Sequence, residues 1–146
     1  AMALADRTGR SLAVCYLDLD GFKPINDRHG HERGDQYLIA VGGILQANLR
    51  RHDSVARIGG DEFVLMLTEL ERPEDCYAQL DRILAAIHEP VTLDGVRHQV
   101  AASIGVTLYP DDRSDPEDLL DHADQAMYRA KQSGGSRYQF YQPERP

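Results

Sequence analysis

The chain has 146 residues, which is enough for one substantial hydrophobic core and too few for two ordinary domains. Its formal net charge of −8 argues against nucleic-acid binding, which needs a basic face to neutralise phosphates. No apolar run approaches the ~18 residues of a membrane span, so we expect no membrane contact by this chain itself. The only two cysteines, Cys15 and Cys76, fall in apolar patterns typical of reduced core residues, which favours the cytoplasm; a membrane tether outside the chain stays open.

The first predicted elements are a short helical turn over residues 4–10 and a buried strand over residues 12–20. Asp18 and Asp20 end this strand and share one face, because side chains alternate along a strand. The structural alternative is that these acids solvate the strand end or cap the next helix. That alternative is favoured for Asp20 but not for Asp18, because burial of a carboxylate without a partner is costly.

A short helix over residues 21–30 and a longer one over residues 32–49 are predicted next, separated at Gly30. Two β-favouring segments follow, joined through Gly59-Gly60. Paired glycines accept the positive φ of a hairpin turn, so we expect a hairpin whose tip carries Asp61 and Glu62.

The second half of the chain alternates helices and strands. In chain order these are a helix over 73–87, a hairpin over 91–96, a strand over 99–109, a helix from Asp115 to Gly134 and a strand over 138–141. The pattern predicts an α+β fold of the βαββαβ kind, in which helices cover a central sheet that contains antiparallel strands. Its short leading segment suggests one domain, residues 1–146, excised from a longer protein.

Asp18 and Asp61 converge if their two strands are neighbours. Two converging carboxylates suit Mg²⁺, which assists phosphoryl and nucleotidyl transfer. A pair of solvated loop acids explains the spacing equally well.

Longer motifs resemble one known family. Arg57–Phe63 (Arg-Ile-Gly-Gly-Asp-Glu-Phe) is similar to the signature of the GGDEF family of diguanylate cyclases, and Leu17–Asp35 resembles the family's second long motif. Ala102–Val106 and Ala123–Lys131 resemble its later strand and helix. The resemblance covers nearly the whole chain and implies a nucleotide-cyclase-like, ferredoxin-like sandwich. It extends to cyclase domains joined to a phosphodiesterase domain.

The resemblance also implies roles for individual residues. Two Mg²⁺ ions, or Mn²⁺ in their place, would be held by Asp18, the carbonyl of Leu19 and Asp61. Catalysis would use Asp61, Glu62 and Lys23. GTP would be bound by Phe22, Lys23, Asn26, Asp35, Gly59, Gly60 and Lys131. Within that set Asn26 and Asp35 would read guanine, because a carboxylate accepts hydrogen bonds from its N1–H and 2-amino group.

Three further features of the sequence bear on regulation and on catalytic competence. Arg50-x-x-Asp53, before Gly59, is similar to the family's product-inhibition site. Gly135 stands where the family usually carries a second phosphate-binding Arg or Lys, and the family's Asp-x-Leu-Thr motif before the first strand is absent. Loss of one charge-assisted contact costs about 1.5–3 kcal/mol, so weakened GTP binding is an open alternative.

The activity implied is condensation of two GTP into cyclic di-GMP and two pyrophosphates by a homodimer with product inhibition. The competing interpretation is a regulatory module that binds GTP or cyclic di-GMP and controls an attached phosphodiesterase or other output domain. A purely structural dimerisation domain would leave Asn26 and Asp35 unexplained.

Overall fold

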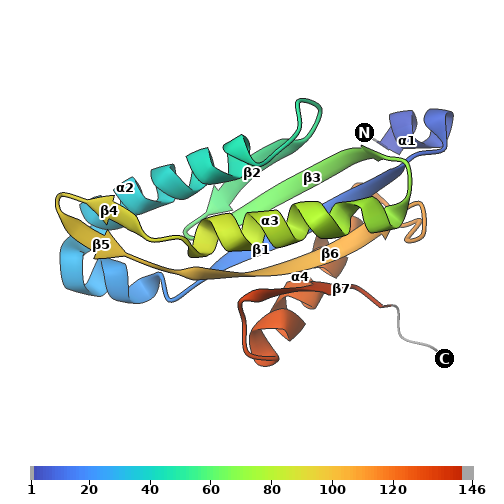
Figure 1. Ribbon diagram of the computed structural model, residues 1–146. Helices are drawn as coiled ribbons and strands as arrows, with labels where there is room; N and C mark the ends of the chain where they lie inside the picture. Colours follow the sequence, from blue (N-terminus) through green and yellow to red (C-terminus); the bar gives the residue numbers. More distant parts are fainter. Residues whose placement is uncertain (1, 143–146) are drawn as a thin grey trace.

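The computed structural model describes residues 2–142 (Figure 1). Its elements, in chain order, are α1 (Met2–Thr8), β1 (Ser11–Asp20), α2 (Lys23–Ala47), β2 (Ser54–Gly59), β3 (Glu62–Leu70), the 3₁₀ turn η1 (Pro73–Asp75), α3 (Cys76–His88), β4 (Val91–Leu93), β5 (Val96–His98), β6 (Ala101–Tyr109), α4 (Pro116–Gln132) and β7 (Arg137–Phe140). Within residues 2–142, no helix combines the length and the apolar character needed to cross a membrane.

The central sheet has five strands in the order β2-β3-β1-β6-β7. All neighbouring pairs are antiparallel except β6 and β7, which run parallel. Strands β4 and β5 form a separate two-stranded hairpin. The predicted α+β architecture is therefore confirmed, with one parallel pair at the β7 edge.

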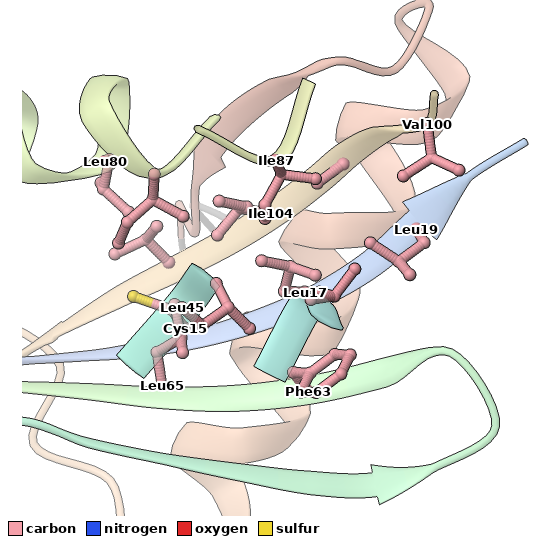
Figure 2. Packing of buried hydrophobic residues seen from close by; sticks show 14 of the residues in the cluster. Cys15, Leu17, Leu19, Leu45, Phe63, Leu65, Leu80, Ile87, Val100 and Ile104 are labelled. Atoms are coloured by element: carbon pink, nitrogen blue, oxygen red, sulfur yellow. The ribbon is translucent and has the colours of Figure 1, made fainter. Parts of the chain in front are cut away.

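Strand β1 lies at the centre of the sheet and contributes to both of its faces. Its alternate residues Cys15, Leu17 and Leu19 are buried in the core that α2 and α3 cover, as Figure 2 shows. Leu12 and Val14 pack on the opposite face against α1 and α4. Asp18 and Asp20 belong to this second face, so they emerge on the α4 side of the sheet.

Helix α4 packs directly on the backbone of β6 at Gly105. A Cβ at this position would overlap the backbone carbonyl of Ala123 and the backbone nitrogen of Met127. Only a residue without a side chain allows this contact. The close approach fixes the end of α4 next to the end of β1.

Two predicted boundaries differ in detail. The two helices predicted on either side of Gly30 form one α2 that is interrupted by the non-helical Gly30 (φ 87°, ψ 166°). In the central hairpin Gly59 pairs with Glu62, so the turn residues are Gly60 and Asp61 and not the two glycines. Gly60 takes the positive φ of 52° that this turn needs, and Glu62 already belongs to β3.

Candidate functional site

Asp18 and Asp61 lie close together where β1 ends beside the β2–β3 hairpin. Asp18 pairs with Glu62 in the β1–β3 register, and the backbone nitrogen of Leu19 donates to the backbone carbonyl of Asp61 at 3.3 Å. Glu62 accepts a hydrogen bond from the Tyr16 hydroxyl at 3.3 Å. The predicted convergence of the two strands is confirmed, and Asp18, Leu19 and Asp61 lie together.

The local environment disfavours the ionised form of Asp18. Burial, followed by repulsion from Asp61, raises its pKa from 3.8 to about 6. Lys131, at the end of α4, partly offsets this shift because its Nζ lies 3.4 Å from Asp18 Oδ2. A partly buried carboxylate whose pKa is raised beside a second carboxylate is a site that gains from a bound cation.

These few protein ligands suit Mg²⁺, which takes most of its ligands from water and substrate, better than a metal that only protein side chains coordinate. Among the described residues, no three His, Cys, Asp or Glu side chains are placed to share a metal ion. Mg²⁺ is usually bound through one or two carboxylates together with waters and substrate phosphates. Asp18 and Asp61 with the Leu19 carbonyl match that incomplete set.

Asp20 holds the site together in a way that sequence reasoning missed. Its two carboxylate oxygens accept hydrogen bonds from the Ser103 hydroxyl (2.9 Å), Lys131 Nζ (3.2 Å) and the Ser136 backbone nitrogen (3.0 Å). It does not cap α2, which has no side-chain cap. Asp20 therefore joins β1, β6 and the loop after α4.

Gly135 lies in that loop with a positive φ of 71°. A Cβ there would lie 2.7 Å from Asp20 Oδ2. The loop geometry thus favours glycine where the family usually has a cationic residue. Lys131 and Arg137 are the nearest cations in sequence.

We expect Asp18→Asn to stabilise the fold. Because folding raises the pKa of Asp18, the folded chain binds this proton more tightly, so stability falls as pH rises from about 4 to about 6. Above that window a neutral side chain removes the free-energy cost of burying the ionised Asp18 carboxylate. Each kcal/mol gained in the free energy of unfolding raises Tm by roughly 2–4 °C. Thermal unfolding at about pH 7.5 should show the gain, and at about pH 5 the gain should shrink. An equal gain for Asp27→Asn, an exposed carboxylate on α2, would contradict this account.

The predicted guanine-reading residues lie around the kink of α2. A Cβ on Gly34 would overlap the Asn26 amide oxygen and lie 3.2 Å from the Phe22 ring. Asn26 is thus packed against the residue that precedes Asp35. Asp35 itself is exposed, and so are Lys23, Gly59 and Gly60, whereas the Phe22 side chain is buried in the core. Only the backbone of Phe22 is available to a ligand.

Gly34→Ala should displace the Asn26 amide and weaken GTP binding. Overpacking of this kind costs about 1–3 kcal/mol in stability as well. Gly42→Ala is the matched control, because a Cβ there meets nothing within 4 Å and alanine gains about 1 kcal/mol over glycine in a helix. Calorimetric titration with GTP and thermal unfolding of both variants would test this. Unchanged GTP affinity in folded Gly34→Ala would rule out Asn26 as a guanine contact.

The predicted inhibitory pair has one buried and one exposed member. Asp53 is buried and accepts hydrogen bonds from the backbone nitrogens of Arg50 and Thr68, both at 2.9 Å, and from the Gln79 side chain at 2.8 Å. These bonds shape the β2 entry and occupy both carboxylate oxygens. Arg50 is exposed. The inhibitory role of the pair stays a prediction.

Comparison with known proteins places this geometry in a family. The model of the family described as "Diguanylate cyclase, GGDEF domain" matches residues 1–137. MucR of Pseudomonas aeruginosa, a bifunctional diguanylate cyclase/cyclic di-GMP phosphodiesterase, is 41% identical over 97% of this chain and 21% of MucR. The cyclic di-GMP phosphodiesterase NbdA of the same species is 41% identical over 91% of this chain and 17% of NbdA. The chain thus spans a minor part of these relatives.

Among solved structures, the GGDEF domain of TpbB (YfiN) from Pseudomonas aeruginosa superimposes with a TM-score of 0.93 at 37% identity, covering 98% of this chain and 89% of that one. The five-stranded sheet with flanking helices is a nucleotide-cyclase-like fold. The chain belongs to the GGDEF diguanylate cyclase domain family.

Proposed function

We propose that this chain is a diguanylate cyclase domain that condenses two GTP into cyclic di-GMP and two pyrophosphates. The observation that carries the proposal is the adjacency of Asp18 and Asp61 through the β1–β3 register. In the proposal the chain acts in the cytoplasm, as one domain of a longer bacterial signalling protein.

In this proposal Asp18, Asp61 and the Leu19 carbonyl hold two Mg²⁺ ions, or Mn²⁺, and Glu62 assists from the start of β3. The bound metal would neutralise the triphosphate and polarise the α-phosphate. Lys131 would exchange its contacts with Asp18 and Asp20 for phosphate oxygens. Asp20 would then keep the loop after α4 in place through Ser103 and Ser136.

The base would be read beside the α2 kink, where the Asn26 amide packs on Gly34. The Asp35 carboxylate accepts from guanine N1–H and the 2-amino group, and adenine lacks a matching donor pair. Lys23 and the backbone of Phe22 would contact the phosphates.

One site would hold one nucleotide, so the reaction requires two copies of the chain. Each copy positions a GTP whose 3′-hydroxyl attacks the α-phosphorus of the other, and pyrophosphate leaves in both attacks. A two-fold homodimer satisfies this requirement. Cyclic di-GMP would inhibit through Arg50 and Asp53, with Arg50 as the accessible contact.

The test is GTP turnover with Mg²⁺ by this domain fused to a constitutively dimeric coiled coil. Cyclic di-GMP and pyrophosphate should form together in a ratio of one to two. An Asp61→Asn version of the same fusion is the matched control. GTP binding without either product would refute the proposed cyclase.

One observation favours a second function. Gly135 replaces a phosphate-binding cation, and a Cβ there would lie 2.7 Å from Asp20 Oδ2, so the loop does not readily accept the usual residue. A domain with weak turnover would serve as a GTP- or cyclic di-GMP-binding regulator of an attached output domain. Calorimetry that detects nucleotide binding by a fusion without turnover would favour this function.

A further inference from the structure

A cavity lies between the first half of α2 and strand β5 of the β4–β5 hairpin. Its volume is about 210 Å³, several times the ~30 Å³ that a water molecule occupies in the liquid. Its polar lining comes from α2, from β5 and from the residue that follows β5, and it is mainly basic: Arg28, His29, Arg97, His98 and Gln99. Asn26, Asp35 and Lys131, which belong to the proposed GTP site, do not line it.

The two arginines of this cavity have no acidic partner. Within the described part of the chain, neither Arg28 nor Arg97 has a carboxylate within 4.0 Å. The nearby acids Glu32 and Asp94 line an adjacent cavity, where Asp94 pairs with Arg33 at 3.2 Å. The cavity therefore carries two guanidinium groups, one from α2 and one from β5, whose positive charge no nearby carboxylate neutralises, although the chain as a whole is acidic.

His98 lines the same cavity. Its side chain is nearly buried, with 5% of its surface exposed, and Arg33 Nη1 lies 3.0 Å from its Nε2. A guanidinium can only donate, so Nε2 must accept and the ring proton must lie on Nδ1. Burial, His29 and Arg33 all lower the pKa of His98, which agrees with a neutral ring. The structure gives its Nδ1 no hydrogen-bond partner among residues 2–142.

We propose that this cavity binds a small phosphate-bearing anion of the size of pyrophosphate, clamped between Arg28 and Arg97. Guanidinium groups match phosphate oxygens through paired, charge-assisted hydrogen bonds. His98 lines the cavity with a neutral ring whose Nδ1–H would serve as a donor, and no carboxylate in the lining opposes the anion. Gly21 also lines the cavity and precedes Phe22 and Lys23, so an occupant would adjoin the proposed GTP site. The proposal does not require that the domain be a cyclase.

The test is titration of the metal-free chain with inorganic phosphate, pyrophosphate and chloride at matched ionic strength. Calorimetry gives the affinity, and amide chemical shifts of Gly21 and Gln99 report the place of binding. Arg28→Gln and Arg97→Gln should each weaken pyrophosphate binding about tenfold or more. Arg82→Gln, an exposed arginine on α3, is the matched control and should change nothing.

Lys131→Ala distinguishes this cavity from the proposed GTP site and should leave metal-free pyrophosphate binding intact. Loss of binding in Lys131→Ala would place the anion at the GTP site and overturn the proposal. So would wild-type affinity in Arg28→Gln and Arg97→Gln, equal shifts with chloride, or no binding at all. Phosphate binding without pyrophosphate binding would overturn the assigned size.

Discussion

Replacement of Asp61 by asparagine should reduce cyclic di-GMP formation about a hundred- to a thousandfold. Asp61 lies beside Asp18 at the hairpin turn, and in the proposed site an amide oxygen would carry too little charge to replace a carboxylate that binds the metal over a triphosphate. The fold should survive, because the side chain sits at a turn and not in the core. Product formation by the dimerised domain, with GTP saturating, measures the effect.

Asp27→Asn serves as the control for this experiment, since it removes one exposed acid from α2 and leaves the Asp18–Asp61 pair intact. Its turnover should match that of the unaltered fusion. Full activity in Asp61→Asn would mean that the carboxylate has no role in metal binding, and the proposed set of ligands would fall.

Gly105→Ala should give the largest loss of stability. The added methyl would overlap backbone atoms of Ala123 and Met127, and backbone cannot rotate away as a side chain can. The resulting separation of α4 from β6 should lower the free energy of unfolding by about 3 kcal/mol or more. In a chain of this size that loss lowers Tm by roughly 6–12 °C.

Gly43→Ala is the control for that measurement, because a Cβ there meets nothing within 4 Å and an exposed helical position favours alanine. Its Tm should rise slightly. An unchanged Tm in Gly105→Ala would show that α4 can shift on the sheet without cost.

Most of the fold was predictable from local signals. The apolar run of β1, the helical stripe of α3 and the Asp115–Pro116 start of α4 each follow from periodicity or capping, and Asp115 does accept from the Asp118 backbone nitrogen. The turn of the central hairpin was predicted one residue too early. A register shift between Arg57 and Gly59 moves it, and that shift depends on pairing with β3.

Only the site residues that belong to sequence motifs could be predicted from the sequence. The Asp18–Asp61 adjacency followed from two motifs and one assumption about neighbouring strands. The role of Asp20 depends on Ser103, Lys131 and Ser136, which only packing of α4 on β6 brings together. Burial of Asp53 was equally hidden, because its donor Gln79 comes from α3. An acidic residue whose hydrogen-bond donors lie far away in the sequence produces no local sequence pattern.

The central position of β1 has a consequence for synthesis. Leu17 pairs with Phe63 on one side and Ile104 on the other, so both partner strands leave the ribosome after β1 does. An apolar strand with two open edges is prone to pair with other chains until those partners arrive. The nascent domain should therefore depend on chaperone shielding until β6 has been translated, and release before that point should favour aggregation over folding.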